Sequence, residues 1–143
     1  MDAAGPFSSI SGTLMSIPFC IATTLVHGVP SMRHMTTYDD GSVNGLVART
    51  TLVTDPGVPV LSAIIEADTA DGATHRHEQR MTPADYAFDR ATLRELLTRT
   101  GAEQGLEPGL FERIERVVDA LPNGRIEEVV GLFTAIEPRR VAA

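Results

Sequence analysis

"SGTLMSIPFCIATTLVHG", residues 11–28, decides the fold, because this stretch is almost uncharged and dense in apolar side chains. Ser16 stands where a helix N-cap is expected, Pro18 is tolerated in a first turn, and Gly28 suits the position just past a helix end. We therefore expect a buried helix from about Ile17 to Val26. Because it is apolar almost all round, it is expected to be a central helix or one that faces another chain.

The same stretch lacks the pattern of a signal peptide or a membrane span. The ten residues before it contain Asp2 and no Lys or Arg, whereas a signal peptide begins with positive charge. Polar residues and Pro18 interrupt the run well short of the roughly 20 apolar residues that cross a bilayer. The single Cys20 excludes an intrachain disulfide. We expect a cytoplasmic protein with no membrane partner.

The composition is that of an ordinary globular protein, with 43% apolar and 22% charged residues among 143. The net charge is −7, and every one of the 12 basic residues is arginine. An acidic chain without a basic stripe is not expected to bind nucleic acid, because phosphate contacts dominate that affinity. The absence of lysine excludes Schiff-base chemistry by a side-chain amine.

Beyond the apolar helix, the pattern changes to that of strands and then back to helices. The next twenty residues predict one or two short helical turns. Residues 51–81 carry apolar runs between turn signals, which predicts a first strand near Arg49–Val53 and a hairpin that turns at Asp71–Gly72. From Asp89, a helix cap, the period returns to 3.6 and predicts three helices.

These patterns predict an α+β fold, with a small three-stranded antiparallel sheet packed with helices. The expected elements fill residues 11–137, which we expect to form a single domain. Residues 1–10 and 138–143 show no such pattern and are expected to be flexible tails.

Four segments share, in chain order, the motif spacing of one family. "SIPFCIATTLVHG" (16–28) is similar to a helix S-x-P-Y-x-x-A-x-x-L-x-x-G, and "DDGSVNGLVARTTLVTD" (39–55) to a stretch D-P-x-V-x-x-L-x-x-R-V. "AIIEADTADGATHRHEQR" (63–80) is similar to a hairpin V-x-V-x-x-x-D-G, and "TLRELLTRTGAEQGL" (92–106) to a leucine-rich helix. The chain thus resembles the MmgE/PrpD family, which includes 2-methylcitrate dehydratases, cis-aconitate decarboxylases and related epimerases.

The resemblance covers roughly residues 11–135 and implies the smaller, C-terminal α+β domain of that family. Its members are much longer and carry a large helical domain ahead of this one. The resemblance implies a lyase or isomerase that acts on a carboxylate or carbonyl substrate, with a helical partner. It also places the apolar helix beneath an active site at the domain junction. Where the family has a tyrosine near the start of that helix, this chain has Phe19.

The densest polar cluster of the sequence, residues 31–40, supplies the catalytic candidates His34 and Tyr38. If this segment is helical, residues four apart share a face, and a His–Tyr or His–Asp pair can move protons near neutral pH. The alternative interpretation is a polar helix on the surface.

The N-terminus of the apolar helix supplies the substrate-binding candidates, because its unpaired N–H groups suit a carboxylate or an enolate. Thr13 and Ser16 would add hydroxyl groups, and Phe19 and Cys20 an apolar wall. We expect the site where this terminus meets residues 31–40. No metal or organic cofactor is expected, because proton abstraction beside a carboxylate needs only a base and an oxyanion stabiliser. The alternative is that these residues only pack the domain junction.

A metal site on the hairpin is a weaker hypothesis. His75 and His77 lie on the same face of a strand, a spacing that zinc or copper can use. In the nearby sequence, only Glu66 or Glu78 offers a third ligand. An ordinary solvated hairpin face is the favoured interpretation.

Three hypotheses for function follow. The chain is the small subunit or detached domain of an MmgE/PrpD-like lyase, a stand-alone dehydratase, isomerase or cyclase of specialised metabolism, or a non-catalytic binding or assembly module. Its apolar helix would be exposed in a monomer. We therefore expect a homo-oligomer or a complex with a separately encoded helical chain, with Phe19 at or beside the interface.

Overall fold

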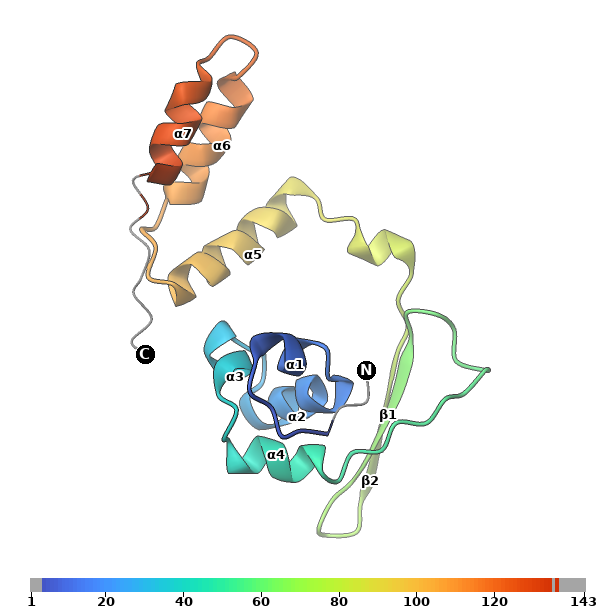
Figure 1. Cartoon of the computed structure of the whole chain (residues 1–143). Helices are drawn as coiled ribbons and strands as arrows, with labels where there is room; N and C mark the ends of the chain where they lie inside the picture. The colour runs from blue at the N-terminus through green and yellow to red at the C-terminus, as the bar shows by residue number, and fades with distance from the viewer. Residues whose placement is uncertain (1–3, 135, 137–143) are drawn as a thin grey trace.

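A computed structural model describes residues 4–134 and 136, and it shows a mixed helix and sheet architecture (Figure 1). The α+β prediction is confirmed at this level. The elements are α1 (Ile10–Leu14), α2 (Ile17–His27), α3 (Met32–Thr36), α4 (Gly41–Val47), β1 (Ala63–Asp68), β2 (Thr74–Gln79), a 3-10 turn (Pro83–Tyr86), α5 (Arg90–Glu103), α6 (Leu110–Ala120) and α7 (Ile126–Thr134).

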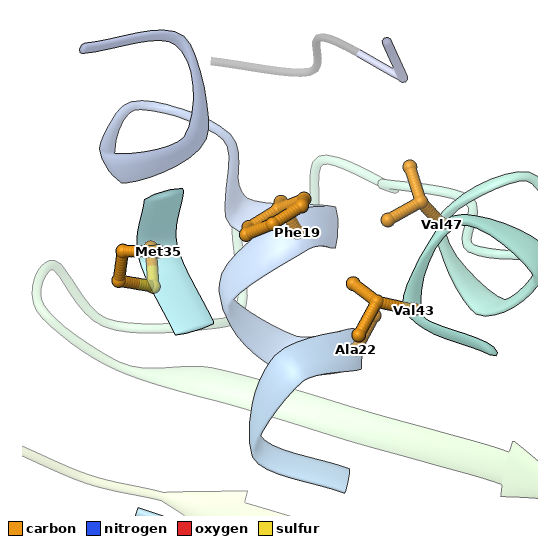
Figure 2. Close-up of a cluster of buried hydrophobic side chains, with 5 residues drawn as sticks. All are labelled: Phe19, Ala22, Met35, Val43 and Val47. Carbon is orange, nitrogen blue, oxygen red and sulfur yellow. The ribbon is translucent and has the colours of Figure 1, made fainter. Parts of the chain in front are cut away.

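The core lies in the N-terminal part of the chain, where α1, α3 and α4 surround α2. Its five buried apolar side chains come from α2, α3 and α4 (Figure 2): Phe19, Ala22, Met35, Val43 and Val47. Phe7 adds its ring edge-on to that of Phe19, with 4.9 Å between the ring centroids. Full burial of a large apolar side chain contributes about 1.5–3 kcal/mol, so this small unit has a genuine if modest core.

The predicted ends of α2 are confirmed to within one residue. The Ser16 hydroxyl oxygen accepts a hydrogen bond from the Phe19 N–H at 3.2 Å, which satisfies one of the unpaired donors of the first turn. Gly28 ends the helix with a φ of 76°, a conformation that glycine adopts without strain. Its N–H donates to the Thr24 carbonyl at 2.9 Å.

The hairpin turns where the sequence predicts. β1 and β2 pair antiparallel, with Ile65 opposite His77. The Gly72 N–H donates to the Thr69 carbonyl at 2.9 Å, and Gly72 has a φ of 85°, so glycine is the favoured residue there.

The predicted three-stranded sheet is wrong in its strand count, because the described residues form a sheet of two strands. Arg49–Val53 is not a strand. The Thr50 N–H donates to the Val47 carbonyl at 3.1 Å, so the chain continues the last turn of α4. Pro56 and Pro59 follow, and proline cannot donate to a strand ladder.

The three C-terminal helices form where they were predicted. Asp89 caps α5 by accepting a hydrogen bond from the Thr92 N–H at 2.7 Å. Two arginines of α5 pair with carboxylates of α6: Arg90 with Asp119 at 2.6 and 2.8 Å, and Arg94 with Glu115 at 2.6 Å. In Figure 1, α6 and α7 lie side by side, beyond α5 and away from the N-terminal core.

Many large apolar side chains of the chain remain exposed. Residues 51–100 include no buried residue, although they contain the whole hairpin and most of α5. The chain exposes 10873 Å², whereas a compact monomer of 15.3 kDa exposes roughly 7,100 Å². The expected tail at 138–143 lies outside the described residues. So do residues 1–3 of the expected N-terminal tail.

Candidate functional site

Two histidines and an aspartate meet where α2, α3 and α4 come together. His27 is the last residue of α2, His34 belongs to α3, and Asp40 is the N-cap of α4. The two imidazole rings are stacked, with 4.3 Å between their centroids and 13° between their planes. His27 Nε2 lies 2.9 Å from Asp40 Oδ2. We call these three residues the histidine cluster.

Asp40 provides the negative charge of the histidine cluster. Its Oδ1 accepts hydrogen bonds from the N–H groups of Ser42 at 2.9 Å and Val43 at 3.1 Å. The Val43 N–H, followed by the His27 ring, lowers the pKa of the Asp40 carboxyl group. Asp40 is therefore ionised at neutral pH, and its Oδ2 accepts a hydrogen bond from the N–H at Nε2 of His27.

His34 is held by local hydrogen bonds as well as by the stack. The Ser31 N–H donates to His34 Nδ1 at 3.2 Å, and the Ser31 hydroxyl oxygen accepts from the His34 N–H at 3.2 Å. This reciprocal cap fixes the orientation of the ring. Because Nδ1 accepts a hydrogen bond, the neutral ring carries its proton on Nε2.

Tyr38 does not share a helix face with His34. α3 ends at Thr36, and Thr37 has an extended ψ of 93°. The expectation that His34 and Tyr38 lie four residues apart on one helix is therefore not met. Tyr38 is half-buried between α3 and α4, and its carbonyl accepts a hydrogen bond from Asn44 Nδ2 at 2.9 Å.

The substrate-binding candidates lie at the other end of α2 and are mostly closed to solvent. The Thr13 hydroxyl donates to the Met35 carbonyl at 2.7 Å, and both Thr13 and Ser16 are 0% exposed. Phe19 is 1% exposed in the core, so the chain itself covers its side chain, and its expected place at or beside an interface stays a prediction. Cys20 is half-buried, and burial raises the pKa of its thiol, which keeps it protonated.

Thr13 thus reaches α3 through the Met35 carbonyl, but the structure does not bring Ser16 and His34 together. Ser16 caps the start of α2 and His34 stacks on its last residue, and an 11-residue helix is about 16.5 Å long. Sequence reasoning missed His27, which is one of the polar residues that interrupt the apolar run at 11–28. The helix dipole favours a basic residue in the last turn of a helix, and His27 directly before Gly28 is the sequence feature that could have pointed to it.

The hairpin histidines do not form a metal site. The register places His75 opposite Ala67 and His77 opposite Ile65, whereas Glu66 and Glu78 face the opposite side of the hairpin. Across residues 4–134 and 136, no group of three His, Cys, Asp or Glu residues has a geometry suited to a metal ion.

No family model matches the chain, and neither does any curated protein or any solved structure. Among the helices of the described part of the chain, none is both long enough and apolar enough to cross a membrane.

Proposed function

We propose that the chain is the small subunit or detached domain of an MmgE/PrpD-like lyase, of the dehydratase, decarboxylase or isomerase type. It acts on a carboxylate or carbonyl substrate and is completed by a helical partner subunit. The need for a partner is inferred from one observation: none of the residues from 51 to 100 is buried. An isolated two-stranded hairpin is marginally stable in water, so such a segment needs a surface to pack against. The sequence resemblance supports the class of reaction.

The histidine cluster supports a proton transfer beside a carboxylate or carbonyl group. His27 donates through Nε2 to Asp40, which leaves Nδ1 as the basic nitrogen of the neutral ring. In the proposed reaction, Nδ1 removes the α-proton and the Asp40 carboxylate stabilises the imidazolium that forms. The same proton then leaves with the β-hydroxyl group as water, so the elimination is balanced.

His34 has a different role in this proposal. With its proton on Nε2, the neutral ring donates a hydrogen bond but is not a base at that nitrogen. A neutral imidazole that donates in this way stabilises a developing enolate oxygen, as in other enzymes that use a histidine as an electrophile. His34 therefore keeps a catalytic role in this proposal, as the hydrogen-bond donor to the oxyanion. The role of the base is assigned to its neighbour His27.

The test is an assay of the chain alone and with a separately encoded MmgE/PrpD-type helical chain. We expect water elimination from a hydroxylated tricarboxylate, followed by ultraviolet absorbance of the unsaturated product, only in the complex. His27→Gln and His34→Ala should each lower kcat at least about 100-fold, the usual contribution of acid–base catalysis. His75→Ala, on the exposed hairpin, is the matched control and should retain full activity. A complex that keeps full activity in both variants would exclude the histidine cluster.

A non-catalytic assembly module is the second candidate function. The burial of Thr13, Ser16 and Phe19 favours it, because the residues expected to hold a substrate instead close the core. This candidate predicts a stable complex with the helical chain but no turnover of any carboxylate tested.

A further inference from the structure

The start of α3 depends on a histidine where a capping box usually has glutamate or glutamine. In the spacing S-x-x-E/Q, the fourth side chain accepts a hydrogen bond from the backbone N–H of the first residue. Here the segment is Ser-Met-Arg-His, and His34 Nδ1 accepts from the Ser31 N–H at 3.2 Å. An imidazole nitrogen accepts a hydrogen bond only in the neutral ring. The cap of α3 is therefore complete only while His34 is uncharged.

The His34 ring also faces a second imidazole. It is stacked on His27, with 4.3 Å between the ring centroids. His27 Nε2 lies 2.9 Å from Asp40 Oδ2, so one carboxylate can balance one charged ring of the stack. A further proton, on His34, places two like charges face to face and turns Nδ1 into a donor that opposes the Ser31 N–H. Protonation of His34 thus removes a hydrogen bond and adds repulsion.

The other charged or titratable groups around α3 are of types that keep their charge where histidine titrates. α1 has none, and Arg33 of α3 is exposed and always charged. Glu103 of α5 accepts a hydrogen bond from the Met32 N–H at 2.8 Å. Carboxylates ordinarily titrate at about pH 4, thiols and phenols above about pH 8, and histidine at about pH 6.5. The groups of the first three types are Asp39, Asp40, Glu103, Cys20 and Tyr38. Between about pH 7.5 and 5.5, the response therefore comes from the two stacked histidines.

α3 covers part of the core. Met35 is 5% exposed and lies in the same cluster of buried side chains as Phe19 (Figure 2). The Met35 carbonyl accepts the hydrogen bond of the Thr13 hydroxyl, which joins α3 to α1. Because α3 is only five residues long, it is held by these contacts and by its cap rather than by its own backbone hydrogen bonds. Loss of the cap therefore uncovers buried groups of α1 and α2.

We propose that His34 is a pH-sensitive latch: in mildly acidic solution Nδ1 of its imidazole takes up a proton, the capping box breaks, and α3 leaves the surface of α1 and α2. The released segment binds one more proton than the docked one, so release becomes more favourable as the pH falls. The proposal rests on the geometry of α3 and not on the proposed lyase function. Its readout is the exposure of Met35, which requires no substrate.

The experiment is to oxidise the full chain with a limiting amount of hydrogen peroxide at about pH 7.5 and at about pH 5.5. Peptide mass spectrometry then locates the methionine sulfoxide. Met15 is 58% exposed and serves as the reference within each sample. We expect the oxidation of Met35 relative to Met15 to rise about 10-fold at the lower pH, because a histidine one unit below its pKa is about tenfold more often charged than neutral.

His34→Gln is the decisive variant, because glutamine completes the capping box and does not titrate. In this variant the oxidation of Met35 relative to Met15 should be the same at both pH values. His77→Gln is the matched control, since His77 lies on the exposed strand β2. It should show the same pH-dependent rise as the wild type.

Amide exchange of α4, measured in the same solutions, separates release of α3 from unfolding of the core. α4 should keep its protection at about pH 5.5. Equal relative oxidation of Met35 at both pH values in the wild type would overturn the proposal, and this comparison does not depend on how a variant folds. A His34→Gln variant with the wild-type rise, or a loss of protection in α4 together with that rise, would also overturn it.

Discussion

Thr23 carries the one buried side-chain oxygen or nitrogen atom, among the described residues, that lacks a hydrogen-bond partner. Its side chain is 0% exposed within α2, so folding removes the hydroxyl group from water without replacement. Leaving a buried hydroxyl unsatisfied costs about 1–3 kcal/mol. Valine has nearly the same shape and no polar atom, so it suits this position better.

We therefore expect Thr23→Val to raise the free energy of unfolding by about 1 kcal/mol. Thr13→Val is the matched control, because the Thr13 hydroxyl is equally buried but donates to the Met35 carbonyl at 2.7 Å. That variant leaves a buried carbonyl with a lost donor and should lower the free energy of unfolding by about 1–3 kcal/mol. Urea denaturation measures both. A Thr23→Val variant less stable than the wild type would show that the hydroxyl has a partner in solution.

Asp40 links the histidine cluster to the dependence of stability on pH. Its pKa is lowered in the folded chain, chiefly by the Val43 N–H and then by His27, so the folded state favours the ionised form. The stabilisation is fully present above the unfolded pKa of about 3.9 and is lost as the pH falls through the lower folded value. Asp40→Asn should flatten the decrease in stability below about pH 4. The test is to measure the denaturation midpoint of the wild type and of Asp40→Asn between pH 6 and pH 2, in steps of about one pH unit.

At the scale of elements, two helical glycines differ in what surrounds them. A Cβ atom added at Gly101 of α5 would lie 2.5 Å from Cε2 of Phe111, whereas one added at Gly131 of α7 would meet nothing within 4 Å. Gly131→Ala should raise the free energy of unfolding by about 0.5–1 kcal/mol, because alanine is the better helix former. Gly101→Ala should lower it by about 1–3 kcal/mol, because the Phe111 ring must move. Thermal unfolding followed by circular dichroism compares the two.

The elements that sequence patterns predict correctly are those with local causes. Ser16 and Asp89 cap helices through N–H groups three residues away, and Gly72 supplies a positive φ within its own turn. Whether a segment becomes a strand depends on a partner strand. The strand prediction for 49–53 is wrong because the chain there continues the last turn of α4. Short-range patterns therefore predict helices and turns better than they predict a sheet.

The histidine cluster depends on contacts that no short motif contains. His27 and Asp40 are 13 residues apart, and His27 stacks on His34 only because α2 and α3 fold against each other. Conversely, Thr13 and Ser16 carry hydroxyl groups at a helix start, but tertiary packing buries both. Residue types thus indicate which groups can react, whereas packing decides which ones a substrate can reach.

At the scale of the whole molecule, stability should be concentrated in the N-terminal helices. Local opening is easiest where little apolar surface is buried, and the core side chains of Phe19, Val43 and Val47 all belong to α2 and α4. The two strands of the hairpin pair along their whole length, but every residue in 51–100 is at least partly exposed. Its amide groups therefore open without the cost of exposing a core.

We expect amide hydrogen exchange of the dilute chain to be slowest in α2 and α4 and at least about 100-fold faster in β1 and β2. Adding a helical partner should slow amide exchange in β1 and β2. Mass spectrometry of peptides after timed exchange resolves these segments. Equal protection of α2 and β1 in the dilute chain would contradict the view that the C-terminal half needs a partner to become stable.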